Sequence, residues 1–200
     1  STDKAVRPTS IMGVSKRLAE LYCLHMNTLA STKFITVRFG NVLNSAGSVV
    51  PLFKEQIDQG GPVTVTHKDA TRYFMSIPEA CQLILEASAM GSGGDVYVLD
   101  MGEPVSIIYL AEQMIKLSGS KPGKDIQIIY TGLRPGEKLE EELFFSDENL
   151  RQTGHEKLLL SNASNGCDDR ISLILANLEM SVAAGDVEEM RKIMKGFVEV

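Results

Sequence analysis

The first residues of the chain are of the types that carry proton-transfer chemistry. Thr2, Asp3 and Lys4 follow one another, and a second lysine, Lys16, stands in a segment with helical spacing. Met12 precedes Lys16 by four residues, so both side chains lie on one helix face, one turn apart. Carboxylates and amines can act as general acids and bases, whereas a thioether has no exchangeable proton. A lysine on this face can contact a ligand in front of the helix while the opposite face packs.

The helix that carries Met12 and Lys16 has a recognisable start. Pro8 stops the chain from being helical earlier, and Thr9 or Ser10 can cap the first free N–H groups. The apolar residues expected to face the core are Ile11, Val14, Leu18, Leu21 and Tyr22. We therefore predict an amphipathic helix directly after the Thr–Asp–Lys run.

The composition is that of an ordinary globular protein. The chain has 200 residues, 44% of them hydrophobic and 23% charged, and a net charge of −6. That charge argues against a nucleic-acid surface but leaves a nucleotide ligand open. Cys23, Cys81 and Cys167 fit no metal-ligand spacing, so we expect reduced thiols and no metal site. We find no signal peptide and no apolar run near the roughly 20 residues of a membrane helix, and expect a cytoplasmic location.

Strands and helices are predicted along the rest of the chain. Strands are expected at 33–39, 63–66, 96–99 and 125–130, and helices at 48–57, 77–90, 106–117, 169–184 and 186–197. Ser76 with Glu79 and Asp186 with Glu189 form capping boxes. The faces expected to be buried are Ile77, Cys81, Ile84 and Ser88 in one helix, and Ile107, Leu110, Ala111 and Met114 in another.

Several motifs together resemble the extended short-chain dehydrogenase/reductases, and more narrowly the nucleotide-sugar 4,6-dehydratases of capsule and glycan biosynthesis. These motifs are the Thr2-Asp-Lys-Ala run with its Gly-x-Ser-Lys16 helix, Arg38-Phe-Gly-Asn41, Gly47-Ser-Val-Val-Pro51, Thr71-Arg-Tyr-Phe74 and Gly132-Leu-Arg-Pro-Gly-Glu137. Any one motif is weak evidence, but together they are specific. The resemblance implies an α/β fold: the C-terminal part of an extended dehydrogenase/reductase, with a truncated Rossmann-type parallel sheet and a small α/β substrate-binding domain.

The resemblance also implies a domain organisation. Residues 1–46 and 73–104 would be the remnant of an NAD-binding Rossmann domain, 47–72 and 105–150 the nucleotide-sugar-binding part, and 151–200 a C-terminal helical extension. The glycine-rich turn that binds pyrophosphate in that fold is absent from this sequence. We therefore expect a fragment of a longer enzyme, inactive alone, whose strand at 34–39 presents an open apolar edge and causes association.

The resemblance assigns roles around two ligands. Lys16 would hold the nicotinamide ribose of NAD (NAD rather than NADP), and Phe39 would lie beside the nicotinamide unless it is a core aromatic. The residues assigned to a UDP-sugar are Asn41, Lys54, Arg72, Arg134 and Glu137. For Lys54 the alternative is a solvated surface lysine, and for Arg72 it is a surface ion pair. For Arg134 and Glu137 the alternative is a charged hairpin.

The implied reaction is an internal redox elimination on UDP-N-acetylglucosamine. Carbon 4 gives hydride to NAD, water leaves across carbons 5 and 6, and the hydride returns to carbon 6. Lys4 would take the carbon-5 proton, Asp3 would protonate the carbon-6 oxygen, and Thr2 would hydrogen-bond the carbon-4 oxygen. Met12 stands where most of the superfamily has tyrosine, whose task must pass to Lys4, Asp3 or water. Family members with methionine here tend to retain the carbon-5 configuration.

Two other functions stay open. One is a UDP-sugar 4-epimerase or 4-reductase on the same scaffold, against which Met12 and the Thr–Asp–Lys trio argue. The other is a non-catalytic sugar-nucleotide-binding or assembly module, which should take UDP but not NAD. For the parent enzyme the resemblance implies a homo-oligomer and leaves open an inner-membrane anchor, because long members carry N-terminal membrane helices.

Overall fold

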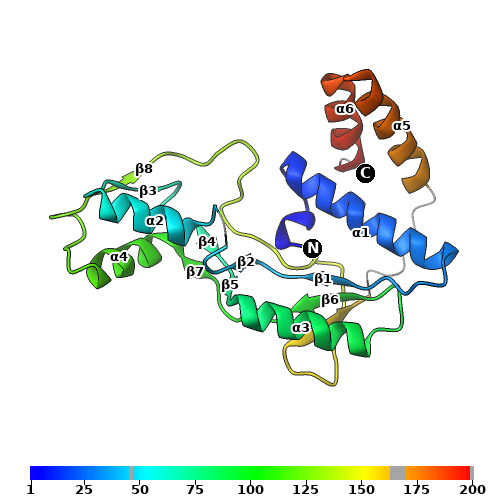
Figure 1. Cartoon of the computed structure of the whole chain (residues 1–200), viewed down its shortest axis with the longest axis horizontal. Coiled ribbons are helices and arrows are strands. Elements are labelled where there is room, and N and C mark those ends of the chain that lie inside the picture. Colours follow the sequence, from blue (N-terminus) through cyan, green and yellow to red (C-terminus); the bar gives the residue numbers. More distant parts are fainter. Residues whose placement is uncertain (46, 163–169, 199–200) are drawn as a thin grey trace. The chain divides into compact units, whose positions relative to one another are not determined.

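The computed structural model describes residues 1–45, 47–162 and 170–198 (Figure 1). Its helices and strands form a mixed α/β fold, as predicted. Contacts divide the chain into two compact units. The first consists of Ser1–Phe39, Leu83–Asp100 and Glu142–Val200, and the second of Gly40–Gln82 and Met101–Glu141.

The first unit contains a four-stranded sheet. Its strands are β1 (Thr36–Arg38), β6 (Val96–Leu99), β9 (Leu150–Gln152) and β10 (Leu158–Ser161), in the order β1-β6-β10-β9. β1 and β6 are parallel, in agreement with the parallel sheet that the resemblance implied. β10 is antiparallel to both β6 and β9. Neither β9 nor β10 was predicted. The run of three leucines in β10 shows no strand periodicity, and this segment is a strand because it pairs with β6.

The outer edge of β1 is partly covered by the first residues of the chain. The Ser1 amino group donates to the Val37 carbonyl at 2.8 Å, and the Asp3 amide donates to the Phe39 carbonyl at 3.1 Å. Alternate residues of the two segments are therefore bonded, as in a pair of parallel strands. The edge that we expected to be open thus has part of its hydrogen-bonding groups satisfied.

Helix α1 (Ile11–Leu29) packs into the core of the first unit. Ser10, and not Thr9, is the residue before its first turn, and its side chain accepts a hydrogen bond from the Gly13 amide at 3.1 Å. The core of this region consists of Val14, Leu18, Leu21, Leu24, Val96 and Ile171, with residues of α5 (Ile171–Ala184) and α6 (Val187–Val198) packed against it. Ile11 and Tyr22 were predicted to be buried and are about half exposed, because they flank the buried stripe.

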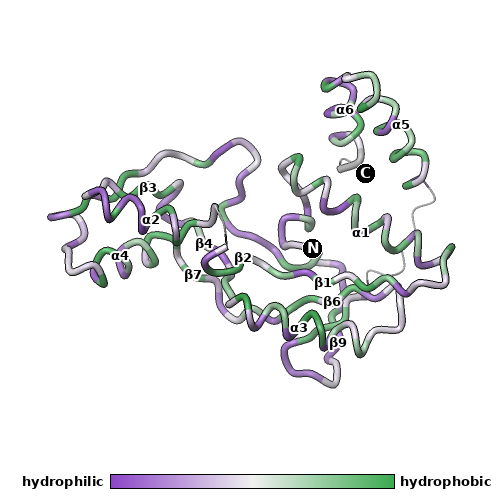
Figure 2. The backbone as a smooth tube through the Cα atoms, viewed as in Figure 1, coloured by the Kyte–Doolittle hydropathy of each residue, from purple (hydrophilic) through white to green (hydrophobic). Residues whose placement is uncertain are grey.

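Helix α3 (Ile77–Met90) has the predicted bounds but buries a different face. Ala80, Leu83 and Ala87 are at most 5% exposed, whereas the predicted set Ile77, Cys81, Ile84 and Ser88 is exposed. Figure 2 shows α3 as a mostly apolar helix, so hydropathy alone does not distinguish its faces. The small alanines are buried because they let the helix backbone approach its neighbours closely.

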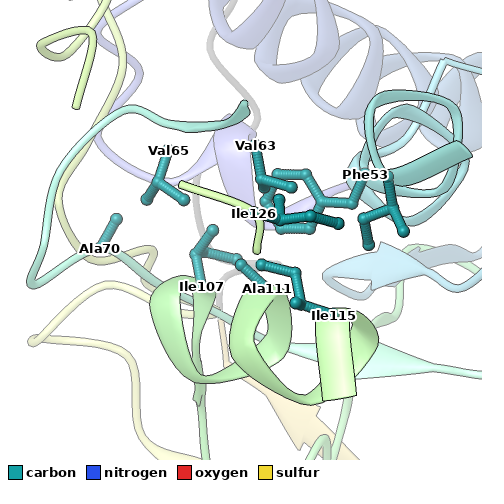
Figure 3. Packing of buried hydrophobic residues seen from close by; sticks show 9 residues of the cluster. Phe53, Val63, Val65, Ala70, Ile107, Ala111, Ile115 and Ile126 are labelled. Carbon is teal, nitrogen blue, oxygen red and sulfur yellow. The ribbon is translucent and has the colours of Figure 1, made fainter. Parts of the chain in front are cut away.

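The second unit has its own apolar core between two helices and short strand pairs. The helices are α2 (Val49–Asp58) and α4 (Ile107–Leu117), and the pairs are β3 (Val63–Val65) with β8 (Ile128–Tyr130), β2 (Asn41–Val42) with β5 (Phe74–Met75), and β4 (Thr71–Arg72) with β7 (Val105–Ser106). Phe53, Val63, Ile107 and Ile115 meet in the core (Figure 3). Ile107 and Ala111 are buried as predicted, and Leu110 and Met114 pack against the cluster.

Among the described helices, none combines the length and the apolar character needed to cross a membrane.

Candidate functional site

Thr2, Asp3 and Lys4 form a compact hydrogen-bonded group at a short 3-10 helix, η1 (Asp3–Ala5). The Thr2 hydroxyl donates to Asp3 Oδ1 at 2.7 Å, and Lys4 Nζ donates to the same oxygen at 2.9 Å. Asp3 is 0% exposed, and its Oδ2 has no hydrogen-bond partner among the described residues. A buried carboxyl oxygen without a partner is unusual, and it leaves one acceptor available to a ligand.

η1 lies directly against the first turn of α1 because residue 13 is glycine. A Cβ atom at this position would lie 2.3 Å from the Lys4 carbonyl oxygen and 3.0 Å from Pro8 Cβ. No side chain other than hydrogen fits such an approach to a backbone oxygen. Gly13 therefore keeps the Thr2–Lys4 group next to the helix that carries Met12 and Lys16.

Met12 and Lys16 lie on the exposed side of α1. Met12 is 46% exposed, and Lys16 is exposed with no side-chain partner in the part of the chain that the structure describes. Phe39 follows the last residue of β1 and is half-buried. An unpaired ammonium suits ribose hydroxyls, and a half-buried ring suits contact with a nicotinamide, so the residue types fit the nicotinamide half of NAD.

Arg7 was missed by the sequence analysis. Its backbone has φ 40°, a value rarely taken by residues with a side chain, and it lies between η1 and α1. The guanidinium contacts the Glu142 carboxylate at 3.0 Å and the Ser146 hydroxyl. These contacts tie the segment between the Thr2–Lys4 group and α1 to a segment more than a hundred residues later. Only the X-Pro sequence, which restricts the residue before Pro8, could have drawn attention to it.

A buried charge cluster fixes β1 to α1. Arg38, 0% exposed, donates through Nε and Nη2 to both oxygens of Glu20 and through Nη1 to Glu148, all at 2.9 Å. Arg17 also contacts Glu20, at 3.0 Å. The Phe145 ring lies 4.9 Å from the Arg17 guanidinium and 5.6 Å from that of Arg38, within range of cation–π attraction. The strand end that leads to Phe39 is thereby held against the helix bearing Lys16.

Glu20 and Arg38 stay ionised because they are paired. Burial by itself would raise the pKa of Glu20, but the hydrogen bonds and charge of Arg38 outweigh burial and lower that pKa below its ordinary value. Burial opposes the charge of Arg38 in the same way, and the bonds from Glu20 and the charges of Glu20 and Glu148 raise the Arg38 pKa. Glu20 and Arg38 are therefore a fixed, charged pair within the fold.

In the second unit, Arg72 and Glu137 pair with each other. Arg72 is 8% exposed, and its Nη2 contacts Glu137 Oε1 at 2.9 Å. Its Nη1 donates to the carbonyls of Thr71 and Leu139, at 2.7 and 3.0 Å. Glu137 also accepts from the Thr66 hydroxyl, at 2.9 Å.

The other predicted substrate residues of the second unit differ in how they are held. Asn41 lies in β2, and its backbone N–H donates to the Tyr73 carbonyl at 3.0 Å. The side chains of Lys54, on α2, and Arg134 are exposed and have no partner among the described residues. Both cations are thus available to a ligand.

The predicted site residues fall into two groups. Thr2, Asp3, Lys4, Met12, Lys16 and Phe39 belong to the first unit, and Asn41, Lys54, Arg72, Arg134 and Glu137 belong to the second. The structure brings Thr2, Asp3 and Lys4 into contact within one unit, and Arg72 and Glu137 within the other. Over the described ranges, no group of three or more histidine, cysteine or acidic residues could hold a metal ion.

Comparisons with known proteins place this chain among similar sequences and folds. The profile of the family described as "Polysaccharide biosynthesis protein" matches residues 1–163. The capsular polysaccharide biosynthesis protein CapD of Staphylococcus aureus is 52% identical over 179 residues, which are 89% of this chain and 30% of that protein. A UDP-glucose 4-epimerase of Rickettsia canadensis is 40% identical over 152 residues, 74% of this chain and 43% of the epimerase.

A solved structure extends the likeness to the fold. The X-ray structure of Pen from Bacillus thuringiensis superposes with a TM-score of 0.72 at 34% sequence identity, over 80% of this chain and 50% of Pen. This likeness supports the expected dehydrogenase/reductase type of α/β fold. The chain spans between 30% and 50% of the lengths of these proteins.

Proposed function

Because this chain belongs to the polysaccharide biosynthesis protein family, we propose that it is part of an enzyme that dehydrates a UDP-N-acetylhexosamine across carbons 5 and 6. The substrate is UDP-N-acetylglucosamine and the product a UDP-4-keto-6-deoxy sugar. The observation that carries this proposal is the buried Asp3 carboxyl group. One of its oxygens is shared by Thr2 and Lys4, and the other has no partner among the described residues.

The Asp3–Lys4 pair supplies both proton-transfer groups that an elimination needs. A proton that moves from Lys4 Nζ to Asp3 across their 2.9 Å contact leaves a neutral amine and a carboxylic acid. The amine then removes the carbon-5 proton, and the acid protonates the departing carbon-6 hydroxyl, so the protons balance.

Thr2 and Met12 define what happens at carbon 4. The Thr2 hydroxyl donates its single proton to Asp3. The Thr2 oxygen can therefore only accept, and it accepts a hydrogen bond from the carbon-4 hydroxyl. Met12 lines the helix face without proton chemistry, and the base for this hydroxyl comes from the Thr2–Lys4 group or water. The carbon-5 configuration is retained.

The nicotinamide cofactor is assigned to Lys16 and Phe39. NAD, when bound, supplies the acceptor for the carbon-4 hydride and returns it to carbon 6. Lys16 has an exposed ammonium without a partner in the described part of the chain, which donates to the ribose hydroxyls. The 200-residue chain lacks the glycine-rich turn that binds the pyrophosphate of NAD, so by itself it does not turn over substrate. Its UDP site does not depend on that turn.

The UDP-sugar is assigned to the second unit. Arg134 carries an exposed guanidinium group and Lys54 an exposed ammonium group, and both attract the diphosphate. Asn41, at the start of β2, is assigned to the sugar nucleotide. Arginine presents N–H groups in a planar fork that matches phosphate oxygens.

A 4-epimerase is the second candidate, because relatives from Rickettsia carry that name at 40% identity. Epimerisation needs a group that exchanges the carbon-4 hydroxyl proton but no acid at carbon 6. Met12 lacks the exchangeable proton of the tyrosine on which epimerases of this scaffold rely, and the buried Asp3 is suited to the carbon-6 protonation that epimerisation lacks.

The test uses a full-length protein that contains this chain. It is incubated with UDP-N-acetylglucosamine and NAD in deuterated water and followed by proton NMR. A new carbon-6 methyl signal with deuterium at carbon 5 supports dehydration, and the coupling constants report the configuration. Conversion to the galacto isomer without a methyl signal would make the protein an epimerase. Unchanged sugar with binding still detected would favour a non-catalytic module.

A further inference from the structure

We infer that Glu137 is a positioning residue, which sets the loop 132–138 so that the Arg134 guanidinium is presented to a diphosphate. This inference rests on the proposed function, because the diphosphate is that of the UDP-sugar. It assigns Glu137 an action through Arg134, where the resemblance had implied a direct contact with the UDP-sugar, such as a bond to its ribose hydroxyls. Arg72 and Thr66 are its anchors.

Both carboxylate oxygens of Glu137 already have protein donors. Oε1 accepts from the Thr66 hydroxyl and from Arg72 Nη2, each at 2.9 Å. Oε2 accepts from the backbone N–H of Arg134 at 3.1 Å. The side chain is 22% exposed. The carboxylate is therefore the point where the loop is joined to the residues near the ends of β3 and β4.

The loop itself is a turn that Glu137 closes. The Glu137 amide donates to the Arg134 carbonyl at 2.9 Å, the bond between first and fourth residues of a β-turn. Pro135 and Gly136 are its central residues, and Gly136 has φ 77°, as expected for glycine in a type II turn. With the Glu137 side chain bonded to the Arg134 amide, the two ends of the turn are tied twice.

The anchor at Arg72 is rigid. Its guanidinium is held by the carbonyls of Thr71 and Leu139, and the residue is 8% exposed. A charge removed from water in this way requires its carboxylate partner, so Glu137 is fixed by the same ion pair that it completes. Arg134, by contrast, has an exposed side chain with no partner in the described ranges. Arg72 is thus a structural arginine, whereas Arg134 in the loop is available to a ligand.

The test is a double-mutant cycle in UDP binding, measured by calorimetry on the 200-residue chain. Arg134→Ala should weaken UDP binding roughly tenfold to hundredfold, as loss of a charge-assisted bond does. Glu137→Gln should weaken it by a smaller factor, and the double variant should bind no more weakly than Arg134→Ala alone. Losses that multiply in the double variant would overturn the inference, because Glu137 would then act independently of Arg134.

A second ligand distinguishes positioning from ribose binding. 2′,3′-Dideoxy-UDP lacks both ribose hydroxyls, so a direct bond from Glu137 cannot form. A positioning residue gives the same fold-loss for Glu137→Gln with UDP and with the dideoxy analogue. A loss seen with UDP only would reassign Glu137 to the ribose. Glu140→Gln is the matched control, since Glu140 is exposed, carries the same charge and has no partner among the described residues.

Failure of the proposed function is detected separately. If the unmodified chain does not bind UDP, the assignment of UDP to the second unit is wrong, whatever the role of Glu137. Amide hydrogen exchange then tests the loop without a ligand. Glu137→Gln, and Thr66→Val as a second variant, should speed exchange at the Arg134 amide, whereas Glu140→Gln should not. An unchanged rate at this amide in properly folded variants would overturn the positioning role.

Discussion

At the scale of single residues, the decisive feature is the ion pair of Asp3 with Lys4. The Asp3 oxygen in this pair is buried and also accepts a hydrogen bond from Thr2. Asp3 would be costly as an isolated buried carboxylate, and Lys4 and Thr2 offset that cost at one oxygen only. The remaining oxygen, Oδ2, has no partner among the described residues. An unsatisfied group of this kind is more often retained for function than for stability.

Replacement of either member of the pair should strongly slow dehydration in the full-length protein. We expect Asp3→Asn and Lys4→Met each to lower kcat by roughly a hundredfold to ten-thousandfold, the range for loss of a general acid or base. UDP binding, which we assign to the second unit, should be unchanged. Formation of the carbon-6 methyl signal measures the first effect and calorimetry the second. A Lys4→Met variant with near-normal turnover would show that another base acts at carbon 5.

A different residue, Glu20, should make stability depend on pH. Its pKa is lowered in the folded protein, so it contributes stability above the ordinary value of 4.5, and that contribution is lost as the pH falls through the folded pKa. Thermal melting between pH 7 and pH 3 should show this loss, and Glu20→Gln should show a flatter profile. At pH 7 the same variant should be destabilised by about 3–5 kcal/mol, because Arg38 keeps a buried charge with one partner fewer. Glu188→Gln, at an exposed residue of α6, should behave like the unmodified chain.

At the scale of elements, the packing of η1 on α1 positions the Thr2–Lys4 group, to which we assign the proton transfers. Hydrogen at position 13 is what allows the Lys4 carbonyl to approach the helix. Arg7, with its contacts to Glu142 and Ser146, holds the segment between the two elements. The Arg38 cluster then fixes β1 to the same helix.

Substitution of Gly13 by alanine should separate η1 from α1. The added methyl would meet the Lys4 carbonyl oxygen at 2.3 Å, and overpacking against backbone costs about 1–3 kcal/mol. Gly196→Ala is the matched control, because residue 196 lies in α6 with nothing within 4 Å of an added Cβ. That change should be neutral or stabilising by up to about 1 kcal/mol, from helix propensity. Equal melting temperatures for the two variants would contradict the role given to Gly13.

At the scale of the whole molecule, the chain consists of two compact units, each with its own core. The residues assigned to proton transfer lie in the first, and those assigned to the UDP-sugar lie in the second. The edge of β1 is paired only with Ser1 and Asp3 among the described residues, which leaves a short strand edge. Such edges promote association between chains.

Separate titrations of the isolated chain with UDP and with NAD should show which of the two ligands it binds. UDP should bind, and NAD should not, because the sequence contains no glycine-rich turn for the pyrophosphate. Light scattering on the same samples should show association through the β1 edge. Tight NAD binding would disprove the first expectation, and a monodisperse monomer with cooperative melting would disprove the second.

The sequence by itself determined the motifs and most helix bounds through local patterns: a cap such as Ser106 before α4, apolar periodicity, and β-branched residues in β1. The parallel sheet was an implication of the family resemblance, and the pairing of β1 with β6 agrees with it. The same patterns could not predict the buried face of a helix that is apolar on several sides. α3 is apolar on more than one side, and its buried face, with Ala80 and Ala87, is set by how closely a neighbour can approach.

Only the tertiary structure decided the contacts between residues far apart in sequence. Nothing local predicts that Arg38 meets Glu148, that Arg7 meets Glu142, or that Glu137 is bonded to Thr66 and Arg72. Each of these bonds depends on where the chain returns after many residues, and a charged side chain has the same local signature whether it is paired or free. The sequence could therefore name the charged residues of both sites, whereas the fold separates the anchors from the groups left available to a ligand.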